Sequence, residues 1–107
     1  MKIISRKIGS NRGNSRIWVE GKSLTEYGWV KGTQYIKQVY VERVGAPFPE
    51  ACIILGKSFQ GKFKVAGGKD RPVIDLNGKY VTASFKGCEK VTVVITEASI
   101  TISGDLS

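Results

Sequence analysis

The residues best suited to chemistry in this chain are cations, and they gather in two segments that hold few acids. The 107 residues include 17 Lys and Arg against 9 Asp and Glu, which gives a formal net charge of +8. The candidate contact residues in segments 1–19 and 56–69, and just beyond them, are Arg6, Lys7, Arg12, Arg16, Lys57, Lys62, Lys64, Lys69 and Arg71. Such an excess of positive charge favours polyanions, namely nucleic acid, anionic lipid or an acidic protein surface, although solubility alone is the other interpretation.

Aromatic residues lie among these cations. Trp18 alternates away from its apolar neighbours, so its ring is a candidate for stacking on a base or for anchoring a protein partner. Burial in a second layer of the fold is the alternative, and it is the interpretation that we favour for Trp18. Phe59 and Phe63 lie between the lysines of the second segment, where they either contact a ligand or pack that segment itself. Lys22 is a further candidate, because it follows a glycine turn and points outward.

The sequence offers little for catalysis or for a metal site. The chain has no His, which is the usual general base, and it has no nucleophile elbow, phosphate-binding loop or dinucleotide motif. Asp70 and Asp75 do not form a dyad, since one lies in a loop and the other points outward from a strand. Cys52 and Cys88 could form one disulfide, but in a reducing compartment they serve as small hydrophobic residues. We therefore expect a non-enzymatic protein without a cofactor or a metal ion.

The length of the chain fits one domain, residues 1–107. No apolar run approaches the roughly 20 residues that span a bilayer, so we expect no membrane partner. The N-terminus is basic but lacks the apolar core of a secretory signal, and a cytoplasmic location is expected by default.

The elements that would position the cations are mostly strands. In the first half they are a strand at 16–20, a short helix begun by the capping box of Ser23 and Glu26 and ended by Gly28, and strands at 33–44 and 51–55 around a loop at 45–50. In the second half they are a strand at 71–77, a helix begun at Asn77 and ended by Gly87, and strands at 91–95 and 100–103. Residues 1–15 are expected to form a basic N-terminal arm, in which Ile3 and Ile4 could pair as an edge strand. Residues 57–70 are expected to form a basic linker, with a basic hairpin between the two halves as the alternative.

These elements indicate an internal repeat, residues 16–56 and 71–104. The stretches RIWVEGKSLTEYGWVKG at 16–32 and RPVIDLNGKYVTASFKG at 71–87 share inward apolar positions, a Gly-Lys pair before the helix and a Lys-Gly pair after it. Chance similarity of two small segments is the alternative. Neither half is long enough to bury a core alone, so the halves are expected to interlock with pseudo-two-fold symmetry. The fold class expected is therefore mostly β with two short helices, as a tandem strand-helix-strand-strand repeat.

The phrase RIWVEGKSLTEYGWVKGTQYIKQV resembles the SymE-like toxin branch of the SpoVT/AbrB swapped-hairpin superfamily, and also a tandem version found beside DNA cytosine methyltransferases and in phages. The resemblance spans roughly residues 15–103. It implies a small barrel in which two hairpin-and-helix units exchange strands. It also implies nucleic-acid binding through basic residues on one barrel face. The loop at 45–50 and the basic segment at 56–71 depart from the family pattern.

Two functions remain open at this stage. The first is nucleic-acid binding, with DNA preferred to RNA, by a toxin or regulator from a phage or mobile element. In this hypothesis Arg16 and Arg71 hold matched positions in the two repeats and straddle a phosphate backbone. The second is a phage-encoded inhibitor of a host defence complex, an anti-CRISPR or anti-restriction protein that acts by protein–protein binding. In either case the tandem repeat is expected to make the protein a monomer.

Overall fold

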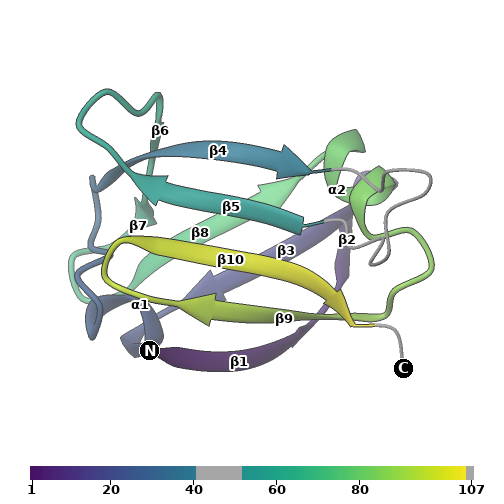
Figure 1. Ribbon diagram of the computed structural model, residues 1–107, viewed down its shortest axis with the longest axis horizontal. Helices are drawn as coiled ribbons and strands as arrows, with labels where there is room; N and C mark the ends of the chain where they lie inside the picture. The colour runs from purple at the N-terminus through teal and green to yellow at the C-terminus, as the bar shows by residue number, and fades with distance from the viewer. Residues whose placement is uncertain (41–51, 106–107) are drawn as a thin grey trace.

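The protein folds into two antiparallel sheets that pack face to face, with two short helices towards opposite ends of the molecule (Figure 1). The structure is a computed structural model that describes residues 1–40 and 52–105. Its elements are β1 (Lys2–Lys7), β2 (Gly9–Asn11), β3 (Asn14–Glu20), α1 (Lys22–Thr25), β4 (Gln34–Tyr40), β5 (Cys52–Lys57), β6 (Phe63–Lys64), β7 (Ala66–Gly67), β8 (Pro72–Asn77), α2 (Lys79–Ser84), β9 (Lys90–Ile95) and β10 (Ser99–Asp105). The prediction of a mostly β fold with two short helices is confirmed.

The larger sheet has six strands in the order β1-β9-β10-β5-β4-β6, and the smaller has four in the order β2-β3-β8-β7. The large sheet has β10 and β5 at its centre, paired so that Ile54 faces Thr101. The small sheet has β3 and β8 at its centre, paired so that Trp18 faces Asp75. Both central pairs therefore join the first half of the chain to the second.

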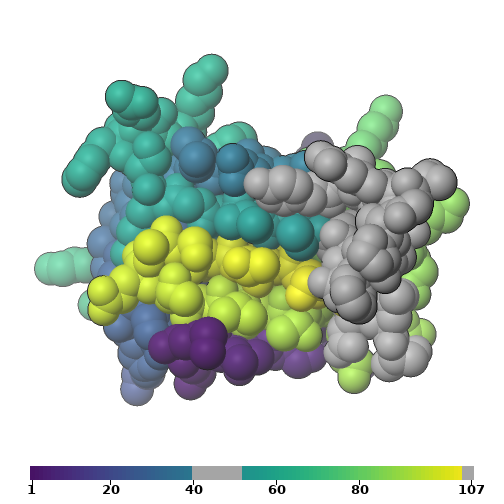
Figure 2. Space-filling model, in the orientation of Figure 1, coloured from purple at the N-terminus to yellow at the C-terminus, as the bar shows by residue number. Residues whose placement is uncertain are grey.

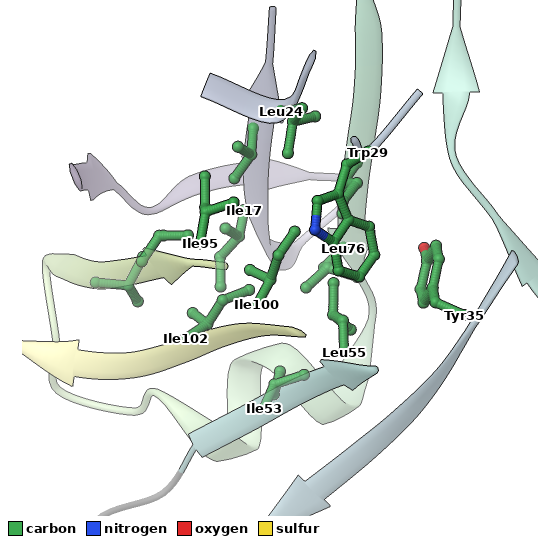
Figure 3. Packing of buried hydrophobic residues seen from close by; sticks show 14 of the residues in the cluster. Ile17, Leu24, Trp29, Tyr35, Ile53, Leu55, Leu76, Ile95, Ile100 and Ile102 are labelled. Carbon is green, nitrogen blue, oxygen red and sulfur yellow. The ribbon is translucent and has the colours of Figure 1, made fainter. Parts of the chain in front are cut away.

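The core lies between the sheets because apolar residues alternate along the central strands. Ile17 and Leu76 are buried neighbours on the inner face of the small sheet, and they meet buried residues of the large sheet such as Leu55 (Figure 3). Trp29 follows α1 and is fully buried, with its indole N–H donating to the main-chain oxygen of Thr96 at 2.8 Å. The buried indole is thus hydrogen-bonded, as an interior polar group requires.

The expected closed barrel is wrong for the described strands. The large sheet ends at β1 and β6, and the small sheet ends at β2 and β7. The chain crosses between the sheets at Ile8 and at Val65, whose N–H groups donate to Glu89 and Thr33. The strands after these crossings have only three and two residues, so they are too short to continue the pairing around a barrel. The result is a sandwich of two sheets.

The segments expected as an arm and a linker contain strands. Residues 1–15 hold β1 and β2, and residues 57–70 hold β6 and β7. β1 pairs with β9, and β6 pairs with β4, so each of these strands adds an edge to the opposite half of the chain. Short strands with few apolar residues carry a weak sequence signal, and their partners lie far away in the sequence.

The helix starts also differ from expectation. Gly21 and Gly78 precede α1 and α2 with φ of 84° and 130°, and no side chain caps either of these described helices. The expected capping box and the cap at Asn77 are therefore wrong, because a glycine turns each strand directly into its helix. The helices end at Thr25 and Ser84, earlier than expected, but Gly28 and Gly87 in the turns that follow have the expected left-handed conformation, with φ of 77° and 86°. The expected loop at 45–50, and the ends of the strands that flank it, lie outside the described residues.

Candidate nucleic-acid interface

Trp18 lies at the centre of the outer face of the small sheet, where 38% of the residue is exposed. The favoured interpretation that Trp18 is buried is wrong, because more than a third of the residue is accessible to solvent. The guanidinium of Arg16 lies 4.5 Å from the centre of the Trp18 ring, within the range of a cation–π contact. The indole of Trp18 is therefore in contact with a cation and still partly accessible to a ligand.

Arg16 is also paired with Asp75 of the neighbouring strand. Its Nε donates to Oδ1 of Asp75 at 2.8 Å, and its Nη2 donates to Oδ2 at 2.7 Å. The hydrogen bonds from Arg16 are the main cause that holds the pKa of Asp75 below its ordinary value, and the bond to Asp75 raises the pKa of Arg16. The pair fixes the guanidinium against Trp18, so Arg16 is an oriented cation rather than a freely rotating one.

Arg71 does not occupy the position that matches Arg16. Arg71 precedes β8, whereas Arg16 lies within β3 and faces Asn77 across the strand pair. The Nε of Arg71 lies 3.3 Å from Oε2 of Glu20, and 73% of its side chain is exposed. A phosphate that straddled Arg16 and Arg71 would compete with a carboxylate at each of them.

Four exposed cations border the small sheet at its two ends. Lys22 is the first residue of α1. It lies beside the start of β8, because the N–H of the preceding Gly21 donates to the main-chain oxygen of Pro72 at 3.0 Å. Lys69 lies in the turn that precedes β8, so it belongs to the same end as Lys22. The other end holds Arg12 and Lys79, each three residues before a member of the hydrogen bond that the N–H of Ser15 donates to Oγ1 of Thr82 at 2.8 Å. All four cations are exposed.

Lys57 has a structural role in the fold. Its Nζ donates to the main-chain oxygen of Tyr27 at 3.0 Å and lies 5.2 Å from the centre of the buried Trp29 ring. The ammonium of Lys57 therefore covers the buried Trp29 ring near the end of α1. Sequence reasoning could not separate Lys57 from its neighbours, because Tyr27, whose main-chain oxygen accepts its hydrogen bond, lies 30 residues earlier in the chain.

Lys62 and Lys64 lie in and just after the connection that runs from β5 to β6 on the other side of β4, and both are exposed without an ion pair within the described chain. Phe59 lies in the same connection and is 98% exposed. Phe63 is different, because its ring stacks on Tyr35 with 5.7 Å between the ring centres. Phe63 is therefore partly packed and 41% exposed, whereas Phe59 is almost fully exposed.

Arg6 and Lys7 lie at the end of β1. Lys7 is exposed and faces Lys90 across the β1–β9 pair, and Arg6 donates from Nη1 to the main-chain oxygen of Ser5 at 3.2 Å. The two basic segments are therefore not one cluster: β2 and the end of β1 lie towards one end of the long axis, and β6 and β7 towards the other (Figure 1).

Lys37 is a cation that sequence reasoning missed. It lies on the strand face that Tyr35 also occupies, with its Nζ 4.3 Å from the centre of the Phe63 ring and 4.0 Å from that of Tyr80. Burial lowers the pKa of Lys37 and is the main cause that raises the pKa of Tyr35 and Tyr80. A lysine at the centre of a run of strand residues was the available signal, since inward positions of a strand are normally apolar.

The described residues hold no group of three or more His, Cys, Asp and Glu side chains suited to a metal ion, and no disulfide joins Cys52 to Cys88. No helix among them is long and apolar enough to cross a membrane. No family model matches this chain, and neither the curated proteins nor the solved structures compared with it include a match. The arrangement of cations and exposed rings is thus the basis for a functional proposal.

Proposed function

We propose that the protein is a non-enzymatic nucleic-acid-binding module, of the toxin or regulator type that the sequence resemblance implies, and that duplex DNA is its main ligand. The proposal includes a tandem repeat in which two swapped-hairpin units form a pseudo-two-fold monomer. Cytoplasmic location belongs to the same proposal. The observation that carries it is a set of exposed cations that recurs at equivalent positions in the two halves.

The strand order supports the repeat. The match takes β1 to β5 and α1, in order, to β6 to β10 and α2. If every strand is replaced by its match, each sheet contains the same strands with the same neighbours, listed from the opposite edge. The strand registers agree with this match. Trp18 and Asp75 are 57 residues apart and face each other at the centre of the small sheet. A two-fold axis between these two residues relates β3 to β8. The same axis explains why strands of the first half pair with strands of the second half.

The same spacing relates cations that the core does not require. Lys7 and Lys64, Arg12 and Lys69, and Lys22 and Lys79 are each 57 residues apart, and the Lys-Gly pairs that follow the helices match Lys31 with Lys86. We call these eight residues the paired cations; all are exposed: Lys7, Arg12, Lys22, Lys31, Lys64, Lys69, Lys79 and Lys86. Packing explains repeated apolar residues and repeated glycines, but it does not explain repeated charge on exposed side chains.

A two-fold set of cations suits duplex DNA because the two backbones of a duplex are themselves related by two-fold axes. The cations at the two ends of the small sheet are separated by the seven residues of β3, which is about 20 Å at the usual rise per residue. This separation exceeds the roughly 12 Å width of the major groove, so the two ends reach the backbones on both sides of it. Contacts of this kind are made to phosphates and carry no base preference by themselves.

Titration of a fluorescein-labelled duplex by anisotropy at several salt concentrations tests the proposal. We expect the logarithm of the affinity to fall linearly with the logarithm of salt, with a slope near −0.9 for each phosphate contact. Lys22→Ala and Lys79→Ala should each make the slope less negative by about 0.9. Lys2→Ala is the matched control, because Lys2 is an exposed cation without a basic counterpart 57 residues later. Binding that is absent at about 50 mM salt, or that does not depend on salt, would contradict the proposal.

One observation favours the second candidate, an inhibitor of a host defence complex that acts by protein–protein binding. The outer face of the large sheet has β10 and β5 at its centre (Figure 2), and it carries exposed Ile3 and Ile36, which are 62% and 43% exposed. Recovery of a stoichiometric protein complex from a bacterial lysate after nuclease treatment, lost in Ile36→Lys, would favour this candidate. Loss of all partners on nuclease treatment favours nucleic-acid binding.

A further inference from the structure

Phe59 is 98% exposed, more than any other large apolar residue among those described. It lies in the connection between β5 and β6, which projects from one end of the molecule (Figures 1 and 2). A single exposed apolar residue is common on protein surfaces and needs no explanation by itself. The surroundings of Phe59 supply the reasons to assign it a role.

The turn that carries Phe59 is held in one conformation. The N–H of Gly61 donates to the main-chain oxygen of Ser58 at 3.0 Å, and the N–H of Gln60 donates to Oγ of Ser58 at 3.2 Å. The side-chain amide of Gln34 donates to the oxygen of Gly61 at 3.2 Å, which ties the turn to β4. A ring presented on a preorganised turn binds without the cost of ordering a loop.

A hollow of about 410 Å³ lies beside the ring. It is lined by Gly32, Thr33, Gln34, Lys57, Ser58 and Phe59. The volume falls in the range of small-molecule sites, and the lining is mainly apolar but includes the polar side chains of Thr33, Gln34 and Ser58. An aromatic ring beside a few polar groups is suited to a flat heterocycle that stacks on the ring and hydrogen-bonds at its edge.

The cations around the hollow indicate what is attached to such a ring. Lys62 and Lys64 follow Phe59 in the chain, at the end of the β5–β6 connection and in β6, and Lys31 is adjacent because the N–H of Gly32 donates to the oxygen of Val65 at 2.9 Å. All three lysines are exposed. One apolar side chain is too little for insertion into a bilayer, and a purely apolar protein pocket would leave the lysines without partners. Phosphates joined to a base satisfy both the ring and the lysines.

Phe59 breaks the symmetry of the paired cations. The residue 57 positions earlier is Lys2, so the molecule has one such aromatic turn rather than two. A ligand that meets this turn is therefore not the two-fold part of a duplex. We propose that Phe59 is a stacking platform for an unpaired nucleobase, and that the protein binds a junction between duplex and single strand, with the duplex on the paired cations. This inference rests on the proposed function.

The test compares two labelled DNA ligands by anisotropy, a blunt duplex and the same duplex with a short single-stranded extension. The wild-type protein should bind the extended duplex about tenfold more tightly, which corresponds to the stacking of one base on an aromatic ring. Phe59→Ala and Phe59→Leu should both lose this preference and leave blunt-duplex binding unchanged, whereas Phe59→Trp should keep it. Since Phe59 packs against little of the protein, none of these variants should unfold it. Ile3→Ala is the matched control for removal of exposed apolar surface.

The outcomes separate this inference from the function on which it rests. Salt-dependent binding of the blunt duplex without a preference for the extension overturns the stacking role alone. A preference that survives in Phe59→Leu also overturns it, because apolar contact without a planar ring would then suffice. Absence of binding to either ligand overturns the proposed function and this inference together. A preference of Phe59→Trp equal to that of the wild type, with loss in Phe59→Leu, supports both.

Discussion

At the scale of single residues, the Arg16–Asp75 pair makes the stability of the protein depend on pH. Hydrogen bonds from Arg16 hold the folded-state pKa of Asp75 below its ordinary value of 3.8. The stabilisation from Asp75 is therefore complete above the pKa of the unfolded state, and it is lost as the pH falls through the lower pKa of the folded state. We predict that the melting temperature of the wild type exceeds that of Asp75→Asn at neutral pH, and that the difference shrinks below about pH 4.

Thermal melts of the two proteins across this pH range measure the difference, and the other carboxylates cancel because both proteins contain them. Asp70→Asn is the matched control, because Asp70 is exposed and makes no ion pair within the described chain. We expect this control to melt with the wild type at every pH. A constant difference between the wild type and Asp75→Asn down to pH 3 would show that the charge of Asp75 is not the stabilising feature.

The sequence identified these residues individually but not as pairs. Arg16 and Trp18 could be selected because they alternate outward beside apolar neighbours, whereas the partner of Arg16 lies 59 residues further along the chain. Lys37 was missed for the same reason, since its rings belong to β6 and α2. The periodicity of a strand predicts the face of the sheet on which a residue lies. Whether a charged residue on that face forms an ion pair depends on the residues of the neighbouring strand.

At the scale of elements, the connection from β5 to β6, which passes close to the backbone of β4, depends on one glycine. A Cβ atom on Gly61 would lie 2.3 Å from the main-chain oxygen of Tyr35, and this backbone cannot move without breaking the pairing of β4. We predict that Gly61→Ala lowers the free energy of unfolding by about 1–3 kcal/mol, as measured by urea denaturation. The matched control is Gly68→Ala, because a Cβ atom there meets nothing within 4 Å.

The control should change the free energy of unfolding by less than about 0.5 kcal/mol. Equal stability of the two variants would mean that the β5–β6 connection does not pack against β4 in solution. The sequence could not assign these roles, because the four glycines of 56–69 only argued against a helix and left a flexible linker or a basic hairpin as the interpretations. In the structure they serve different purposes: Gly61 allows two backbones to approach, and Gly67 has a φ of 88° in the turn before β8.

The main strands were easier to anticipate than the edge strands. β3, β8 and β9 alternate apolar and polar residues, so their positions and inner faces agree with the prediction. β1 and β6 pair only at the edges of the large sheet, and each one pairs with a strand from the other half. The local sequence does not show which distant strand will be the partner. Pairing with that partner stabilises a short edge strand whose own residues have too little strand propensity to predict it.

At the scale of the whole molecule, strand pairing joins the two halves so closely that neither should fold alone. β1 pairs with β9, β3 with β8, β5 with β10 and β4 with β6, and each pair joins residues 1–57 to residues 58–107. The core has the same character, because Ile17 and Leu76 pack against each other from opposite halves. Separation would expose the central edge of both sheets and one side of the core in each half.

We predict that fragments 1–57 and 58–107 are each unfolded when expressed separately, and that mixing them restores the far-ultraviolet circular dichroism spectrum of the intact chain. Titration of one fragment with the other should saturate at one to one, because each half provides the strands that complete the other. The control is a second fragment of the same composition with a shuffled sequence, which should not restore the spectrum. A fragment that folds as a monomer would contradict the interlocked arrangement, since four strand pairs would then be dispensable. A fragment that folds as a homodimer would instead indicate that the two halves are equivalent enough to replace one another, as a pseudo-two-fold repeat allows.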